Sequence, residues 1–352
     1  MAELTGSLML AFFIVFLGTP LVKRLAYRVN ALDEPEARKV HTQEMPRLGG
    51  LAICMGFWAT VILTQEMTRE LYGLLAGGLL ITLVGLFDDI KGVTPKTKLF
   101  VQLIAALLVM VAGVKVEFIT HPFDEVIYLQ YLAYPVTLLW IIGITNAVNL
   151  IDGLDGLAAG VCAIAAITLG VVAYLETSPE AAVLAFLLAA SILGFLRYNF
   201  HPAKIFMGDT GSLFLGFNLS VIAIITMTKS TTVFSVILPV IILGIPIADT
   251  LFAIIRRYVG GKPIFAADKD HIHHRLLNMG LSHRGTVLSI YGLSIVLGVS
   301  AIIMASVTTA QGMLLMTALV LGFSIIAQKL GLLRSKKPQS QPNHAYQHNV
   351  AK

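Results

Sequence analysis

Long apolar runs follow one another along the whole chain, separated by short polar connections. A helix needs about 20 mostly apolar residues to cross a bilayer, and such runs satisfy their backbone hydrogen bonds internally. Only 13% of the residues are charged, against roughly 25% in soluble domains. The sequence therefore predicts an all-α polytopic membrane protein with about eleven transmembrane helices, near residues 4–22, 49–65, 71–87, 98–114, 132–149, 155–175, 180–196, 211–228, 232–255, 285–307 and 311–330.

The basic residues predict the orientation of these helices, because cytoplasmic loops are enriched in Lys and Arg. With the N-terminus outside, 22 of the 25 Lys and Arg residues fall in or next to the inner connections. Only Arg69, Lys115 and Lys229 lie on the outer side. We therefore predict an N-out, C-in protein of the bacterial inner membrane, with its polar loops in the cytoplasm.

Residues 1–333 are predicted to form one integral membrane domain, followed by a disordered basic cytoplasmic tail over 334–352. Within the outer connection 115–131, the sequences VEFIT and EVIYL flank HPFD and predict a short external β-hairpin. Nothing in the sequence indicates nucleic-acid binding, and membrane lipids are the expected surroundings.

The polar stretch NAVNLIDGLDG, residues 146–156, lies between two apolar runs. Its polar residues Asn146, Asn149, Asp152 and Asp155 are spaced three apart, so on a helix they could face one polar cavity. Carboxylates at membrane depth are costly and usually mark function. A polar helix end with capping Asp residues is the plainer alternative.

Two inner loops combine anionic and cationic groups. In the first, RKVHTQEMPRLGG, the side chains of Lys39, His41 and Arg47 could hold phosphates, and Gly49-Gly50 opens a helix where backbone N–H groups favour anions. Ordinary positive-inside charge is the alternative for this loop.

The second of these loops begins with adjacent acids, Asp88 and Asp89, and continues to Lys98. Neighbouring carboxylates resist joint ionisation unless a cation offsets them. Because Mg²⁺ in proteins is bound by one or two carboxylates together with substrate phosphates, the pair fits a Mg²⁺ site. A simple helix end is the alternative, although acids there oppose the helix macrodipole.

Three further segments concentrate polar groups on the same side. The loop RYNFHPAKIFMGDTGS contains Asn199 and Asp209, and its pattern indicates either a ligand-binding loop or an ordinary N-cap of the next helix. Asp249 lies in the apolar sequence PIAD, where it needs a cation or a partner such as a nearby Arg. The next loop carries HIHHRL, whose histidines do not match a known zinc spacing and fit phosphate and sugar contacts better.

The ordered set DD, NxxNxxDGxDGL, GDTGS, PxxD and HIHHRL resembles the polyprenyl-phosphate N-acetylhexosamine-1-phosphate transferases, glycosyltransferase family 4. The likeness covers about residues 5–330 and points to the undecaprenyl-phosphate GlcNAc-1-phosphate transferase branch. The family's DDxxK pattern is not kept, because Lys91 stands one position early.

The resemblance implies transfer of GlcNAc-1-phosphate from UDP-GlcNAc to undecaprenyl phosphate, with Mg²⁺ or Mn²⁺, as a first membrane step of a cell-envelope polysaccharide. A homodimer is a further expectation. The implied metal ligands are Asp249, Asn149, Asp88 and Asp89. The implied catalytic residues are Asp88, Asp89, Asp152, Asp155 and His274. The implied substrate-binding residues are Lys39, His41, Lys98, Asn146, Asn149, Asn199, Asp209, Arg257, His271, His273 and Arg275.

Three alternatives remain open at this point. A phospho-MurNAc-pentapeptide transferase belongs to the same family and differs in its sugar substrate. A membrane transporter would show broken helices in repeated halves, and no such symmetry is visible. A CDP-alcohol phosphotransferase carries an Arg soon after its first Asp-Gly, whereas Leu154 follows Asp152-Gly153 here.

Overall fold

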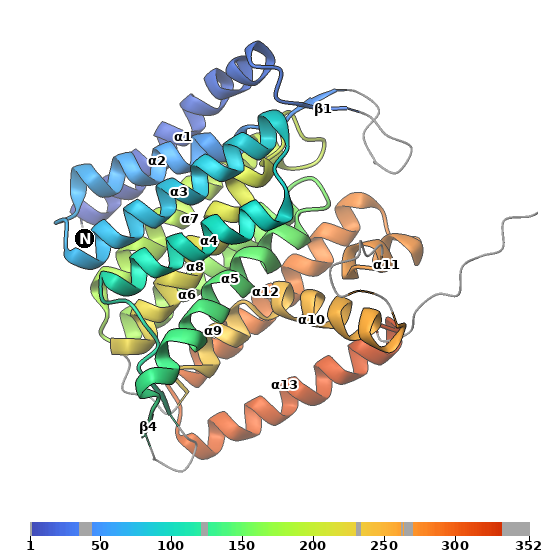
Figure 1. Ribbon diagram of the computed structural model, residues 1–352. Coiled ribbons are helices and arrows are strands. Elements are labelled where there is room, and N and C mark those ends of the chain that lie inside the picture. Colours follow the sequence, from blue (N-terminus) through green and yellow to red (C-terminus); the bar gives the residue numbers. More distant parts are fainter. Residues whose placement is uncertain are drawn as a thin grey trace, which may run out of the picture.

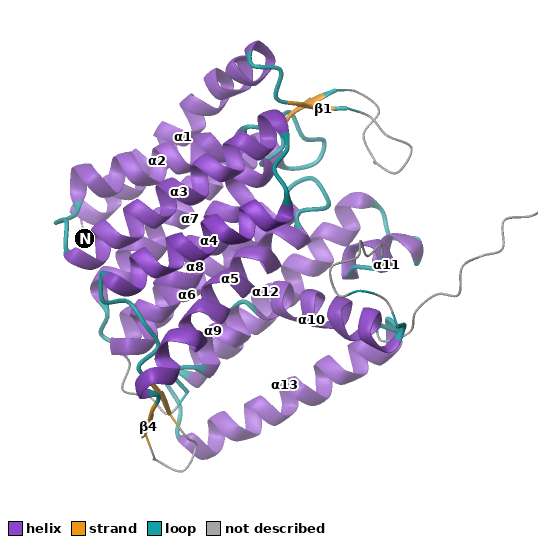
Figure 2. Cartoon of the chain, in the orientation of Figure 1, coloured by secondary structure: helices purple, strands orange, loops and turns teal. Residues whose placement is uncertain are grey.

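The computed structural model describes residues 2–34, 44–120, 126–229, 234–261, 263 and 270–332. Helices dominate this part of the chain and run roughly side by side (Figures 1 and 2). Within it, eight helices are long and apolar enough to cross a membrane. They are α1 (Ala2–Arg28), α3 (Arg69–Lys91), α5 (Ala133–Ile151, preceded by the 3-10 turn Gln130–Leu132), α6 (Leu157–Leu175), α7 (Pro179–Asn199), α8 (Gly208–Lys229), α12 (His283–Met304) and α13 (Thr309–Lys329).

Shorter elements complete the described fold. The remaining helices are α2 (Gly49–Thr64), α4 (Pro95–Val111), α9 (Ile237–Ile242), α10 (Gly244–Val259) and α11 (Ile272–Asn278). Two small antiparallel sheets pair β1 (Leu32–Asp33) with β2 (Met45–Pro46), and β3 (Phe118–Thr120) with β4 (Val126–Tyr128).

Helix α8 forms the centre of the bundle, and every residue of its most apolar stretch is buried. It packs against α2, α3, α5 and α6. At the opposite extreme, α13 is almost wholly exposed and stands apart from the bundle over much of its length in Figure 1. In a bilayer, α13 would therefore face lipid, while α8 provides a rigid internal support for whatever its ends carry.

The all-α multi-pass prediction is confirmed, whereas the count of eleven spans is not: eight helices among the described residues are long and apolar enough to cross a membrane. In the described part of the run expected at 232–255, two helices, α9 and α10, meet at Leu243 and Gly244. The α2 and α4 helices are short, with 16 and 17 residues. The β-hairpin is confirmed, with Phe118 opposite Tyr128. The orientation stays a prediction, and the tail 334–352 lies outside the described residues.

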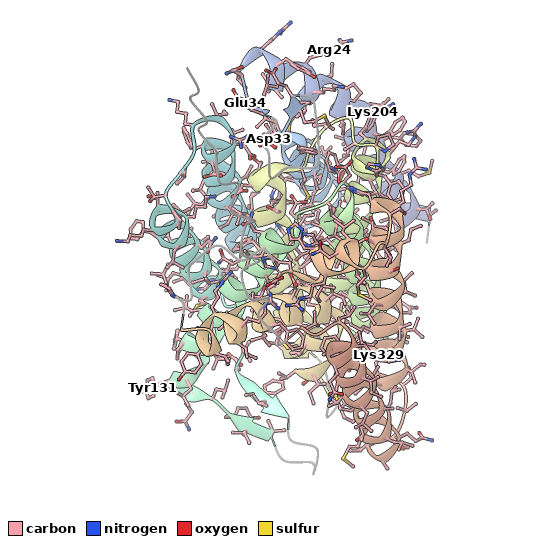
Figure 3. The ribbon with its side chains drawn as sticks, turned by 90° about the vertical axis from the view of Figure 1, so that its right-hand side faces the viewer. Arg24, Asp33, Glu34, Tyr131, Lys204 and Lys329 are labelled. Atoms are coloured by element: carbon pink, nitrogen blue, oxygen red, sulfur yellow. The ribbon has the colours of Figure 1, made fainter. Side chains whose placement is uncertain are left out.

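The polar motifs come together because their helices begin or end at the same end of the bundle. Helix α3 ends after Asp88 and Asp89, where Gly92 adopts a positive φ of 75°. Helix α5 ends next to Asp152, and α8 begins at Gly208. Figure 3 looks onto this end of the molecule, with Asp33 in its upper part, below Arg24 and Glu34. The sequence motifs thus surround one region of the fold.

Candidate active site

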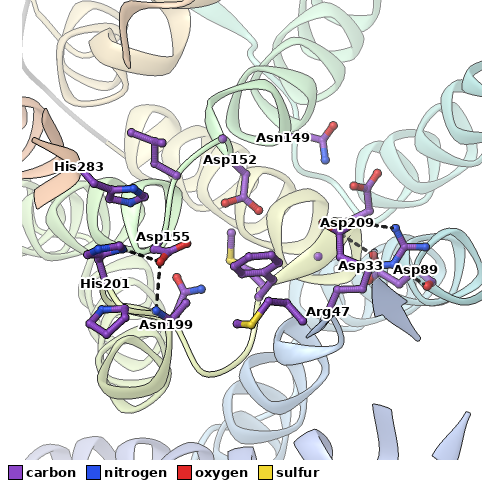
Figure 4. Close-up of a pocket in the computed structure, with 18 of the residues that line it drawn as sticks. Asp33, Arg47, Asp89, Asn149, Asp152, Asp155, Asn199, His201, Asp209 and His283 are labelled. Carbon is purple, nitrogen blue, oxygen red and sulfur yellow. Dashed lines mark hydrogen bonds and ion pairs between the residues drawn. The ribbon is translucent and has the colours of Figure 1, made fainter. Parts of the chain in front are cut away.

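A cavity of about 660 Å³ opens at this end of the bundle (Figure 4). Seven of the site residues predicted from the sequence line it, namely Asp89, Asn149, Asp152, Asp155, Asn199, Asp209 and His274. Three ionisable residues that the sequence did not single out also line it: Asp33, His201 and His283. Lys39 and His41 lie outside the described residues. The cavity therefore gathers four of the six predicted carboxylates, from three separate segments.

An acidic group lies at one side of the cavity, which two of its three members, Asp89 and Asp209, line. Asp88, Asp89 and Asp209 each offer a carboxylate oxygen, and the three atoms lie within 4.8 Å of one another. The Lys98 ammonium lies 2.9 Å from Asp88 Oδ2 and 2.5 Å from Asp209 Oδ2, so two carboxylates share one cationic group. Asp209 was predicted only as a substrate contact, yet the structure makes it part of the acidic group.

Asp89 holds the start of α8 in place. Its Oδ1 accepts from the Asp209 N–H at 2.9 Å, and its Oδ2 accepts from the N–H and hydroxyl of Thr210 at 3.0 and 2.6 Å. Gly208 precedes them with a φ of 69°, and a Cβ there would overlap the Arg47 carbonyl. A carboxylate at a helix N-terminus satisfies donors that lack intrahelical partners. Asp89 thereby fixes where Asp209 points.

The glycine pair at the start of α2 does not provide the expected anion site. The N–H groups of Gly49 and Gly50 donate to the carbonyls of Phe206 and Met207 at 2.9 and 2.8 Å. Because these donors are already used, they join α2 to the loop before α8 and offer nothing to a ligand.

Asp152 lies between the two sides of the cavity (Figure 4). It follows the last residue of α5, and its carboxylate accepts no hydrogen bond from the described residues. Burial, and then repulsion from Asp209, Asp89 and Asp155, together raise the pKa of this carboxyl to about 8. An unpartnered carboxyl in an acidic cavity is suited to bind a proton or to face a cation.

A second polar group lies on the other side of the cavity. His201 Nδ1 is 2.8 Å from Asp155 Oδ2, which also accepts from the Ala203 N–H at 3.0 Å. The His201 ring stacks on His283 with centroids 4.1 Å apart. Arg284 holds the His201 carbonyl at 3.1 Å. Sequence reasoning missed this group because its members are separated by more than 40 residues and no local pattern joins them.

Asn149 and Asn199 line the cavity, and their side chains also form hydrogen bonds between the elements around it. Asn149 Nδ2 donates to Ser212 Oγ at 2.8 Å, which ties α5 to α8. Asn199 is 4% exposed, accepts from the Gly156 N–H and donates to the Ile205 carbonyl. These hydrogen bonds fix the positions of the loops on either side of the cavity.

Asn146 lies outside the cavity lining and pairs with another amide. Its Nδ2 donates to Gln102 Oε1 at 2.7 Å and to the Ile142 carbonyl at 2.8 Å. Gln102 is 1% exposed, so this pair joins α4 to α5 inside the bundle. The geometry gives Asn146 a structural partner, and its predicted substrate contact has no support from the cavity.

Replacing Gln102 by Ala is expected to lower the free energy of unfolding by about 1–3 kcal/mol, because the Asn146 amide loses its buried partner. Thermal unfolding in detergent measures the effect. The double variant Gln102→Leu/Asn146→Leu is the matched control and should unfold closer to the original protein, since no polar group is left unpaired. An unchanged unfolding midpoint in Gln102→Ala would contradict the buried pairing.

The HIHHRL sequence forms the start of α11, and only His274 lines the cavity. His271 and His273 are buried, and Asp249 contacts His271 rather than the acidic group. Arg275 donates to the carbonyls of Leu330 and Gly331 after α13. Arg257 on α10 is likewise absent from the lining. The structure therefore does not bring Asp249 beside Asp88 and Asp89.

The acidic group fits a hard divalent cation. Its donors are carboxylate oxygens, which Mg²⁺ and Mn²⁺ prefer over nitrogen or sulfur. The Lys98 ammonium between Asp88 and Asp209 shows that the arrangement already accommodates positive charge at that point. Both Asp89 oxygens hold the start of α8, and Asp88 Oδ1 accepts from the Val93 N–H at 2.7 Å, which leaves Asp209 with the fewest backbone contacts of the three carboxylates.

The fold and cavity define a multi-pass membrane protein with an acidic site at one end of its helices. A family model described as glycosyl transferase family 4 matches residues 71–227, which include Asp88, Asp152 and Asp209. The chain is 45% identical over 338 residues to a probable undecaprenyl-phosphate N-acetylglucosaminyl 1-phosphate transferase of Bacillus subtilis, covering 96% of this chain and 94% of the relative. The chain belongs to glycosyl transferase family 4, as its motifs predicted, and is a membrane transferase.

Two other relatives show the breadth of the family. A decaprenyl-phosphate N-acetylglucosaminephosphotransferase of Mycolicibacterium smegmatis is 35% identical, over 90% of this chain and 84% of the relative. A phospho-N-acetylmuramoyl-pentapeptide-transferase of Bacillus pumilus is 31% identical, over 80% of this chain and 90% of the relative. The names of these two relatives thus refer to two different sugar groups.

Proposed function

We propose that this protein transfers GlcNAc-1-phosphate from UDP-GlcNAc to undecaprenyl phosphate, giving undecaprenyl-diphospho-GlcNAc and UMP. The relatives named for N-acetylglucosamine support this choice of sugar, and the Bacillus subtilis relative is named for undecaprenyl phosphate. The observation that carries the proposal is the acidic group beside Lys98, next to the unpartnered Asp152. Two phosphorylated reactants repel each other, and groups of this kind are needed to neutralise their charge and hold them together.

Asp88 and Asp209 would hold the divalent ion, which when bound neutralises and polarises the diphosphate. Lys98 and Arg47 add positive charge beside it, and Arg47 is oriented by the Asp89 carbonyl at 2.8 Å. Such positioning and neutralisation supply most of the rate in phosphoryl transfer.

We favour direct attack by the lipid phosphate. An oxygen of that phosphate forms a bond to the sugar-bearing β-phosphorus, while the bond from this phosphorus to the bridging oxygen breaks. UMP leaves with the bridging oxygen and its electron pair. The second pKa of a phosphate is near 6, so the acceptor is mostly ionised at pH 7 and needs little help from a base. Asp152 faces the cavity and would orient the reactants. A covalent Asp intermediate is the rival route, and Asp89 is poorly suited to it because both its oxygens are hydrogen-bonded.

The place of the cavity also fits a lipid acceptor. It lies at the ends of membrane helices, so a phosphate headgroup at the membrane surface can reach it while its isoprenoid chain stays among lipids. We place this end on the cytoplasmic side of the bacterial inner membrane, following the basic loops. The product would start a cell-envelope polysaccharide such as a teichoic acid or O-antigen.

The purified protein tests this function directly. We expect lipid-linked product from undecaprenyl phosphate with UDP-GlcNAc and Mg²⁺, and none when the cation is chelated. UDP-MurNAc-pentapeptide should give no product. The reverse preference would establish the second sugar activity of the family, and absence of lipid product with either nucleotide would refute the transferase proposal.

A further inference from the structure

Asp249 uses both of its carboxylate oxygens to hold helix α11. Its Oδ2 lies 2.7 Å from His271 Nδ1, and its Oδ1 accepts from the Ile272 N–H at 2.7 Å. Since an ionised carboxylate only accepts hydrogen bonds, His271 must carry its proton on Nδ1. Both side chains are buried, at 3% exposure for Asp249 and 6% for His271. The contact therefore joins α10 to the first turn of α11, away from solvent.

This arrangement leaves Asp249 little capacity to bind a cation in the cavity. It does not line the cavity, and Asp209, not Asp249, completes the acidic group with Asp88 and Asp89. A Mg²⁺ ligand presents an oxygen toward the ion and the phosphates that it bridges. Both Asp249 oxygens instead point toward N–H donors of α11.

Helix α11 places two histidines near the loop that follows α5 and contains Asp152 and Gly153. The ring of His273 stacks parallel to that of His271, with centroids 5.8 Å apart and planes 3° apart. His273 lies so close to Gly153 that a Cβ there would be 2.4 Å from its Nε2. The next residue, His274, lines the cavity. A shift of His271 would thus displace both the wall beside Asp152 and the His274 side chain.

The other end of α11 is also fixed. Arg275 donates to the carbonyls of Leu330 and Gly331, and Arg256, two turns after Asp249 on α10, donates to the carbonyl of Leu332. Cations at a helix C-terminus satisfy its free carbonyls and complement its dipole. Helices α10, α11 and α13 are therefore braced as one unit, with Asp249 making the connection nearest to the cavity.

We propose that Asp249 is a positioning residue, which acts through His271 and α11 to place His274 in the cavity and His273 against Gly153, and which does not bind the divalent cation. Only the rate measurements below rest on the proposed function; the metal-binding measurement stands without it.

Two substitutions at this position separate the roles. In Asp249→Asn, the amide oxygen can still accept from Ile272 N–H, and the amide nitrogen can donate to the other tautomer of His271, so the tether remains. Asp249→Ala removes both contacts. A positioning role predicts turnover within about tenfold of the original protein for Asn and a loss of about a hundredfold for Ala, because misplacement of site groups carries that cost. A metal ligand would lose comparable activity in both variants.

Metal affinity is measured directly from the electron paramagnetic resonance signal of free Mn²⁺, with no substrate present. We expect Asp249→Asn to bind Mn²⁺ within about twofold of the original protein, whereas Asp209→Asn weakens binding by about tenfold or more. Weakening of Mn²⁺ binding in Asp249→Asn to the level of Asp209→Asn would overturn the proposal. If Asp249→Ala does not fold, the Asn variant alone decides by the same two measurements.

A double variant distinguishes positioning from general stabilisation. If Asp249 acts through His271, adding His271→Gln to Asp249→Ala should lower kcat little beyond the larger single effect, since the two act as one unit. If the loss in kcat of the double variant equals the product of the two single losses, the residues act independently, and the proposed coupling is contradicted. A transferase assay that fails for the original protein would refute the proposed reaction but leave the Mn²⁺ comparison intact.

Discussion

Replacing Asp209 by Asn is expected to slow the transfer reaction by about a thousandfold or more, which corresponds to about 4 kcal/mol of lost transition-state stabilisation. Asp209 Oδ2 lies 2.5 Å from Lys98 Nζ and belongs to the acidic group that fits the divalent cation. The amide removes the negative charge while keeping nearly the same size. Its backbone N–H can still donate to Asp89, so the start of α8 should remain in place.

Initial rates of lipid-product formation over a range of Mg²⁺ concentrations measure this effect. The Glu117→Gln variant makes the same acid-to-amide change next to the β3–β4 hairpin, where the Glu117 side chain is 54% exposed and pairs with Lys115. That control should retain its rate, because exposed ion pairs contribute little. Normal turnover of Asp209→Asn at any Mg²⁺ concentration would contradict the assignment of Asp209 to the cation.

The sequence could locate the aspartates but could not separate their roles. Asp89 and Asp249 each use both oxygens on the N–H groups of another helix, whereas Asp152 accepts no such bond from the part of the chain that the structure describes. An aspartate that holds a distant helix and one that faces a ligand have the same local pattern. The distinction depends on which helix ends meet, and only the folded chain shows this.

The same reasoning explains what was predicted well. The helical fold follows from long apolar runs and their backbone hydrogen bonds, which are local properties. The end of α5 at Asp152 and the start of α8 at Gly208 could be approximated from Gly and Asp positions. The division between α9 and α10 could not, because its apolar residues continue through the break at Leu243.

Residues that reach the cavity through partners distant in the sequence were not predicted. Asp33 reaches the cavity because β1 pairs with β2 across a connection of more than ten residues. His201 lies in a loop whose sequence shows no periodicity, and its neighbours Asp155 and His283 come from other segments. Long-range pairing of this kind leaves no spacing signal in one sequence.

Asp152→Asn is expected to lower turnover by about a thousandfold and to remove an ionisation from the pH–rate profile. The Asp152 carboxyl has a pKa raised to about 8, first by burial and then by the neighbouring carboxylates. If transfer requires its ionised form, the rate at low Mg²⁺ should rise with pH up to about 8. A bound cation favours the carboxylate, so saturating Mg²⁺ should move this midpoint to lower pH.

The stability of the cation-free protein should also depend on the ionisation of Asp152. Unlike the rate, it should decrease as pH rises. Because the pKa is raised from 3.8 to about 8 on folding, the folded state holds a proton that the unfolded chain has lost in this range. The free energy of unfolding should therefore fall as pH rises between these values. Thermal unfolding in EDTA at several pH values measures this slope, which Asp152→Asn should reduce.

The matched variant Asp152→Glu keeps the carboxylate and should retain an ionisation near the original one, although the longer side chain alters its position. The phosphate acceptor itself titrates near 6 and should leave its own step in every profile. Persistence of the higher step in Asp152→Asn would show that another group is responsible. In that case the pH dependence would belong to another group, and any loss of rate in Asp152→Asn would have to come from the orienting role of Asp152 and not from its ionisation.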